Sequence, residues 1–192
     1  TTNDNIKIVA QVPITGWSSS VQMSDSYDGR VIAASYSTAT AQSIASGSSV
    51  IIDFTTKIYD TTASVTTGAS WKFTAPAYGI YEFIVHAEYD SQAFTADDKI
   101  ALLLHKNGSE VRTLQYKEVQ STTTSYKELR GSGTIELNAG DYIDFRANQN
   151  SGTAKTLIAN ANYNYVSVHR ISSSQTVSAT EVVAFMAEGA SS

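Results

Sequence analysis

The sequence contains no cysteine among its 192 residues. This absence excludes disulfides and thiolate metal sites, and with them a small secreted scaffold held by disulfides. Basic residues are also few, since 13 lysines and arginines are outnumbered by 18 acidic residues and the formal net charge is −5. A chain of this charge lacks the basic surface that nucleic acids and anionic membranes attract, so we expect neither as a partner.

Long apolar runs are missing as well. No run approaches the roughly 18 apolar residues of a membrane-spanning helix, so we expect no membrane insertion. The N-terminal segment, TTNDNIKIVAQ, is not a basic-then-apolar signal sequence, and export by a standard signal is unsupported. Collagen-type Gly-X-Y repeats and sustained heptads are absent too.

Hydroxyl-bearing and small residues are plentiful instead. Only 16% of the residues are charged, whereas Thr, Ser, Ala and Tyr are abundant. This mix is typical of β-rich extracellular or virion surfaces. The length has room for one domain of about 130–150 residues with appendages at its ends.

The most informative stretch, WKFTAPAYGIYEFIVHAEYD, spans residues 71–90. It predicts a short strand, a proline–glycine corner and a long strand. Alternation in the long strand places aromatic residues on one face and Ile80, Glu82, Ile84 and His86 on the other. The aromatic face can fill a sandwich core. The opposite face resembles a surface that something else covers, and a second copy of the chain is the economical candidate.

Turn signals divide the rest of the chain into short strands without a helical period. The pair Asn107-Gly108 is the strongest hairpin signal, because both central positions of a type I′ turn need positive φ, and it predicts that Lys99–Lys106 pairs with Glu110–Glu118. We expect further strands over residues 31–36, 50–54, 133–137, 142–149, 157–160 and 163–171. The pattern predicts an all-β sandwich or barrel with almost no helix.

Two segments near the two ends of the chain are similar in sequence. The serine run and VQMSDSYDGRVIAAS that follow residue 17 are matched by SSSQTVSATEVVAFMA from residue 172. The simplest interpretation is a chain of tandem units, with an N-terminal strand and linker at 1–29, one domain at 30–171, and a linker and strand at 172–192 that opens a further repeat. Chance similarity in a Ser/Ala/Val-rich chain is the alternative.

Four segments of the domain occur in a familiar order: WKFTAP with GIYEF (71–83), ALLLHKNG (101–108), GSGTIEL with a later Gly-Asp turn (131–141), and an aromatic closing strand (163–171). In this order the domain resembles the globular domain of complement C1q, within the C1q/tumour-necrosis-factor superfamily. One departure is an Ala-Tyr insertion that lengthens the proline–glycine corner. The resemblance implies an all-β, C1q/TNF-like jelly-roll sandwich of two antiparallel sheets that assembles as a homotrimer.

A narrower resemblance involves GWSSSVQMS (16–24) and FTTKIYDT (54–61). Both are similar to segments of tail-fibre and other structural proteins of tailed bacteriophages and prophages. This resemblance implies a non-enzymatic module on the surface of a virion, in a tail or head fibre, with other virion proteins and a host-surface glycan or protein as partners. A purely structural spacer and a secreted C1q-like adhesion protein are the alternatives, and an enzyme active on surface polysaccharide comes last.

Histidines and carboxylates do not form a catalytic pattern. The three histidines lie in expected strands without a Cys, Ser or carboxylate at metal-ligand or triad spacing, which favours structural or interface roles. Glu136, Asp141 and Asp144 could suggest paired glycosidase carboxylates, but turn and strand-surface roles explain them better. We therefore expect no enzymatic activity.

Two groups of site residues follow from these interpretations. The expected trimer interface comprises Ile80, Glu82, Ile84, His86, Tyr163 and Tyr165. The two tyrosines belong to it if the valines of the last strand face the core, and the reverse orientation is the alternative. Ligand binding is expected in the loops 91–98, 120–125 and 148–155, through Phe94, Asp97, Asp98, Thr122, Thr123 and Asn150.

A metal site is the remaining question. C1q-like trimers can hold calcium near the threefold axis, so the resemblance makes Asp90, Asp97 and Asp98 candidate Ca²⁺ ligands. These residues lack the Asp/Asn/Gly periodicity of a dedicated calcium loop, which favours a solvated acidic tip. We expect no other cofactor.

Overall fold

The computed structural model describes residues 31–172, which form thirteen β-strands and no helix. The strands are β1 (Ala33–Ser37), β2 (Gln42–Ile44), β3 (Val50–Ile51), β4 (Thr56–Asp60), β5 (Val65–Thr66), β6 (Lys72–Thr74), β7 (Gly79–Phe94), β8 (Lys99–Lys106), β9 (Ser109–Glu118), β10 (Thr123–Leu137), β11 (Tyr142–Gln149), β12 (Lys155–Leu157) and β13 (Tyr165–Ser172). The all-β prediction is confirmed for this part of the chain.

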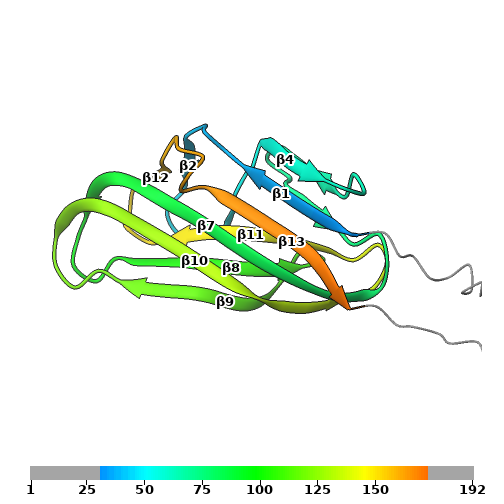
Figure 1. The fold of residues 1–192 in the computed structure, drawn as a ribbon. Coiled ribbons are helices and arrows are strands. Elements are labelled where there is room, and N and C mark those ends of the chain that lie inside the picture. Colours follow the sequence, from blue (N-terminus) through cyan, green and yellow to red (C-terminus); the bar gives the residue numbers. More distant parts are fainter. Residues whose placement is uncertain (1–30, 173–192) are drawn as a thin grey trace, which may run out of the picture. The chain divides into compact units, whose positions relative to one another are not determined.

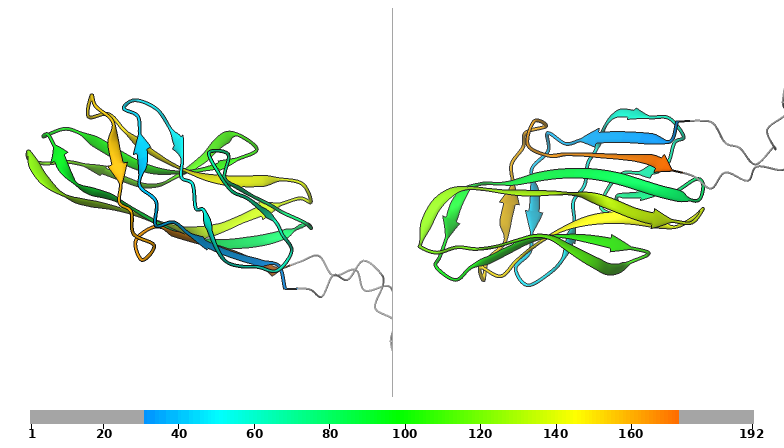
Figure 2. Two further views of the ribbon diagram at one scale, coloured as in Figure 1. Left: turned by 90° about the horizontal axis from the view of Figure 1, so that it is seen from above. Right: turned by 60° about the horizontal axis from the view of Figure 1, so that its bottom comes forward.

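All strand pairs are antiparallel, and they form two sheets. The seven-stranded sheet has the order β2-β12-β7-β13-β1-β4, with β10 on the other edge of β7. The six-stranded sheet has the order β5-β6-β11-β8-β9, with β3 paired to β11. The long strands run between the same two ends of the sandwich (Figures 1 and 2).

Strand β7 lies at the centre of the first sheet and is the longest, at 16 residues. Its inward residues Tyr81, Phe83, Val85, Ala87 and Tyr89 are all buried. The ring of Phe83 meets that of Phe145 on β11 at 5.3 Å between centroids, so the two sheets share one aromatic core. The predicted core face of this strand is therefore confirmed.

The hairpin between β8 and β9 forms where the sequence predicts it. Asn107 and Gly108 have φ angles of 51° and 84°, the positive values that a type I′ turn requires. The side chain of Asn107 donates to the Asp141 carboxylate at 2.8 Å and accepts from the Tyr142 backbone at 2.9 Å. The asparagine thereby also joins this turn to the β10–β11 turn.

Strand β10 is much longer than predicted. It begins at Thr123 rather than near residue 133. The prediction missed this first part because it is mostly polar, with Leu129 its one large apolar inward residue. Its inward Gly131 makes room for Leu114 of β9, whose Cδ1 would lie only 2.7 Å from an added Cβ. Glycine at this position therefore lets the edge of the second sheet close over the first.

Several short strands escaped sequence analysis. The strands β2, β4 and β5 are two to five residues long and largely polar, and β4 is an exposed edge strand. β12 ends at Leu157, the first residue of the strand predicted at 157–160, so that prediction was placed too late in the chain. Such strands carry little alternation, because they bury few side chains.

Residues 1–30 and 173–192 lie outside the described part of the chain. The predicted N-terminal strand, the domain boundaries and the inferred tandem repeat stay predictions. Among residues 31–172 no helix is long and apolar enough to cross a membrane.

Candidate functional site

The outward face of β7 is partly apolar and open to solvent in the single chain. Ile80 and Ile84 are 39% and 46% exposed, while their inward neighbours are fully buried. Tyr59 of β4 is also exposed and shares this side of the sheet through the pairs Tyr59–Ser35, Ser35–Ser167 and Ser167–Ile84. An exposed apolar surface in the middle of a sheet, rather than at its edge, is typical of a binding or assembly surface.

Strand β13 adds tyrosines to this face. Val166 and Val168 are buried, so Tyr165 points outward, where it pairs with His86. Tyr163, in the turn before β13, is also exposed. Of the two orientations left open by the sequence, the structure shows the one with the valines inside. We call the surface formed by Ile80, Ile84, His86, Tyr163 and Tyr165 the isoleucine–tyrosine face.

His86 is the polar centre of this face, although it is only 3% exposed. Its ring lies near those of Tyr163 and Tyr165, at centroid distances of 6.2 and 5.4 Å. Neither ring nitrogen has a hydrogen-bond partner of good geometry. Burial lowers the pKa of His86, and the neighbouring Arg130 cation lowers it further, while the backbone of Tyr163 and the Glu128 carboxylate oppose this shift. His86 is therefore neutral at pH 7.

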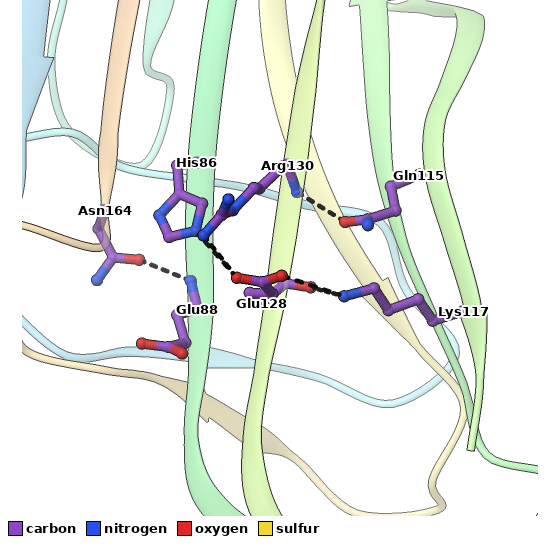
Figure 3. Close-up of polar contacts among 7 residues, drawn as sticks. All are labelled: His86, Glu88, Gln115, Lys117, Glu128, Arg130 and Asn164. Atoms are coloured by element: carbon purple, nitrogen blue, oxygen red, sulfur yellow. Dashed lines mark hydrogen bonds and ion pairs between the residues drawn. The ribbon is translucent and has the colours of Figure 1, made fainter. Parts of the chain in front are cut away.

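Charged side chains from β9 and β10 surround His86 (Figure 3). The Glu128 carboxylate lies 3.9 Å from Nε2 of His86 and 2.8 Å from the Arg130 guanidinium. Lys117 donates to the backbone carbonyl of Glu128 at 2.8 Å, and the backbone N–H of Arg130 donates to Gln115 at 2.7 Å. These contacts join β9 to β10 and hold the charges beside the histidine.

A shallow cavity of about 400 Å³ opens beside the histidine. Its walls include Ile84 and Tyr165 from the isoleucine–tyrosine face, Arg130 from β10 and Leu114 from β9. The mixture of apolar walls with a guanidinium and an unpartnered imidazole suits an inserted amphipathic side chain.

The remaining predicted interface residue, Glu82, is half-exposed and pairs with His169 of β13 at 2.9 Å. The register places this pair next to Ile84 on the same side of the sheet. The six predicted interface residues therefore share one side of the sheet. Whether a second copy covers them stays a prediction.

The predicted ligand loops gather at one end of the sandwich. The turns β7–β8, β9–β10 and β11–β12 are joined by backbone bonds from Asp97 to Val119 (2.8 Å) and from Asn150 to Lys99 (3.2 Å). This end lies opposite the end where β1 begins and β13 finishes (Figure 1). Thr122 is exposed there, as is Asp97.

Some predicted loop residues do not face solvent. Phe94 is the last residue of β7 and is fully buried against the Tyr89 ring, so its predicted role in a binding loop is wrong. Strict alternation from Tyr89 would turn Phe94 outward, but the register of β7 with β10 shifts between Tyr89 and Gln92, and this irregularity returns Phe94 to the core. Thr123 pairs with Phe94 as the first residue of β10, so it lies in a strand rather than a loop.

The candidate metal ligands are engaged locally. Asp98 is buried and accepts the Thr95 backbone N–H at 2.7 Å, and Asp90 accepts that of Ser91 at 2.7 Å. In the described part of the chain no three His, Cys, Asp or Glu residues come together as a metal site. Calcium binding stays a prediction.

The carboxylates considered above also have structural partners. Glu136 accepts the Tyr78 hydroxyl at 2.7 Å, and Asp141 pairs with Lys106 at 2.9 Å. Asp144 was expected at the strand surface but is buried, because the Arg146 side chain covers it and donates from Nε at 2.6 Å.

Sequence analysis missed Lys117, Glu128 and Arg130. Every second residue from Glu128 to Thr134 is polar, which is the pattern of the outward side of a strand. This alternation could have identified Glu128 and Arg130. It was overlooked because this segment was assigned to a loop.

Neither protein-family models nor curated protein sequences match this chain. Solved structures do. Eiger TNF from S. frugiperda is 17% identical with a TM-score of 0.56, over 79% of this chain and 99% of that one. The globular domain of zebrafish complement 1qA is 14% identical with a TM-score of 0.52, over 74% and 98%. Murine APRIL is 12% identical with a TM-score of 0.53, over 74% and 100%. The fold is the C1q/TNF-like jelly roll.

Proposed function

We propose that this jelly-roll chain assembles as a homotrimer through the isoleucine–tyrosine face and acts as a non-enzymatic structural and binding module. The observation that carries the proposal is the exposure of Ile80 and Ile84 in the middle of a sheet, beside two outward tyrosines. Tyrosines and aliphatic residues with few charges are typical of the core of a subunit interface. An obligate interface of this kind buries on the order of 2,000 Å² or more.

The binding part of the proposal rests on the turns at one end of the sandwich. The long strands use their side chains for the core and for the isoleucine–tyrosine face, which leaves the three turns free to vary. Three copies around one axis would present three copies of these turns side by side. Contacts that are weak for one copy would then add up to useful avidity.

The surface of a bacteriophage particle is the proposed location. This part rests on the similarity of residues 16–24 and 54–61 to phage fibre proteins, and the absence of cysteine is compatible with it. The proposed partners are other virion proteins and a glycan or protein on the host surface. A spacer role without a receptor and a secreted adhesion role are the outcomes that remain if host binding fails.

The assembly is tested by replacing Ile84 with aspartate. A carboxylate at this position would be buried without a partner in the trimer but not in the single chain, so we expect Ile84→Asp to remain folded and become monomeric. Val111→Asp on β9 is the matched control, because Val111 is 49% exposed and belongs to the other sheet. Light scattering gives the mass of each protein. A wild-type chain that is already a monomer contradicts the proposal.

The binding role is tested with the same proteins carrying a fluorescent label. We expect the wild-type trimer to label cells of a susceptible bacterial host, and the monomeric Ile84→Asp variant to label them at least about tenfold more weakly through loss of avidity. A folded trimer that labels none of the strains from which related phages are isolated would leave the spacer role.

A further inference from the structure

His86 combines two features that are costly together. It is a titratable side chain with only 3% exposure, and both of its ring nitrogens lack a well-placed hydrogen-bond partner. A buried polar group without a partner is normally tolerated only while it is uncharged. Its position in the isoleucine–tyrosine face means that a neighbouring copy would bury it still further.

The groups packed around His86 do not offer it a free counter-charge. From β10 the Glu128 carboxylate comes within 3.9 Å, but it already binds Arg130 at 2.8 Å and lies 4.0 Å from Lys117 of β9. The other carboxylate is Glu88 on β7, whose own pKa is raised by burial and by Glu128. β13 and the turn before it contribute the rings of Tyr165 and Tyr163. A second cation would therefore sit beside Arg130 in a face that assembly closes to water (Figure 3).

We propose that His86 makes the assembly acid-sensitive, so that protonation of this buried ring opens the isoleucine–tyrosine face and separates the copies. The proposal rests on the trimer proposed above and adds its regulation. Histidine is suited to this role because its charge changes within the physiological pH range.

The direction of the pH effect on the trimer follows from the direction in which the pKa of His86 is shifted. The pKa of His86 is below its ordinary value of 6.5 in the folded chain, and further burial in the trimer lowers it again. The trimer is therefore fully favoured above the pKa of His86 in the separated folded chains, which itself lies below 6.5, and it weakens as the pH falls through that pKa because the separated chains take up the proton more readily. With one His86 in each copy, dissociation takes up three protons, and the trimer dissociation constant should rise up to about a thousandfold per pH unit in this window.

The other histidine on the same side of the sheet differs from His86 in having a carboxylate partner. His169 lies 2.9 Å from the Glu82 carboxylate. His169→Gln is therefore a matched control, since it removes a titratable histidine from this face but leaves His86 in place.

The experiment measures the mass of the full chain by light scattering between about pH 8 and pH 5, the range in which histidine titrates. We expect wild type and His169→Gln to be trimers at the upper pH and to dissociate at the lower one. We expect His86→Gln, which cannot be protonated, to remain a trimer throughout. Dissociation of His86→Gln at the same pH as wild type would overturn the proposal, as would a wild-type trimer that persists at the lower pH.

Two further measurements distinguish a failure of the proposed trimer from a failure of the proposed histidine switch. A wild-type chain that is monomeric at about pH 8 contradicts the trimer itself rather than the switch. If His86→Gln does not fold, hydrogen–deuterium exchange at C2 of the imidazole, measured on the wild-type chain, gives the pKa of His86 directly. We expect a value below the ordinary 6.5, and an equal or higher value would overturn the proposal.

Discussion

At the scale of single residues, the two inward glycines of β10 allow close contact between the two sheets. Gly131 accommodates Leu114, and Gly133 accommodates the Arg112 guanidinium, whose Nη1 would lie 3.0 Å from an added Cβ. Both contacts come from β9, a strand of the other sheet. The Gly-Ser-Gly segment is therefore needed for close approach of the two sheets rather than for flexibility.

Gly131→Ala should destabilise the chain by about 1–3 kcal/mol, because the added methyl group overlaps the Leu114 side chain. Urea denaturation measures the change. The Leu114→Ala variant removes the Cδ1 and Cγ contacts but keeps the Cβ, which would lie 2.8 Å from the added methyl group, so it relieves part of the obstruction. The double variant should therefore be more stable than the sum of the two single changes predicts. Additive effects would show that the outer atoms of Leu114 do not restrict this position.

The same scale shows what sequence alone could and could not predict. Alternation placed the inward aromatic residues and the two outward isoleucines correctly, because a strand in the middle of a sheet has a strict two-residue period. It did not place Phe94, because the polar residues before it concealed the continuation of β7. Nor did it identify the burial of Asp144, which depends on the neighbouring arginine.

At the scale of elements, the β8–β9 hairpin depends on its connection to the β10–β11 turn. Asp141 accepts from the Asn107 side chain, from Lys106 and from the backbone of Asn138, and these bonds, led by that from Asn107, hold the pKa of Asp141 well below its ordinary value. A depressed carboxyl pKa contributes stability that is present above its unfolded value of about 4 and is lost as the pH falls through the folded value.

Replacing Asn107 with glycine tests this connection. Glycine retains the positive φ but removes both side-chain bonds, so Asn107→Gly should lower the Tm by about 3–5 °C at neutral pH. The difference from wild type should shrink in acid, where Asp141 loses its charge in both proteins. Scanning calorimetry at several pH values measures this, and a difference that is constant with pH would show that Asp141 is not involved.

The hairpin was also the element most accurately predicted, because Asn-Gly specifies the turn and thereby which two strands pair. The register beyond the turn shifts twice along β8, which the turn residues do not indicate. The β10 strand was shortened in the prediction by ten residues at its start. Its inward positions include glycines, which contribute nothing to a hydrophobic period, so only the pairing with β7 determines that it is a strand.

At the scale of the whole molecule, folding and assembly should be linked. If three copies are held by the isoleucine–tyrosine face, the Tm of the wild-type chain should rise with protein concentration, by several degrees over about a hundredfold range. The Ile84→Asp variant should unfold at a temperature independent of concentration. A concentration-independent Tm for a trimeric wild type would mean that the single copy is stable without its neighbours.

The fold class was predictable because the four motif segments appear in a fixed order along 31–172. The polar cluster around His86 was not, because only folding brings Lys117 of β9 next to Glu128 and Arg130 of β10, which belongs to the other sheet. Single residues on one strand can be found by periodicity, whereas charges from two sheets require the folded arrangement.

The placement of the turns has one more consequence. The turns β7–β8, β9–β10 and β11–β12 bond to one another at the end remote from the first residue of β1 and the last of β13 (Figure 1). Substitutions in these turns do not change the histidine cluster, the aromatic core or the end of the domain where β1 begins and β13 finishes. If these turns bind the host as proposed, a lineage could change its ligand by substituting a few residues in them, while the rest of the domain is inherited unchanged.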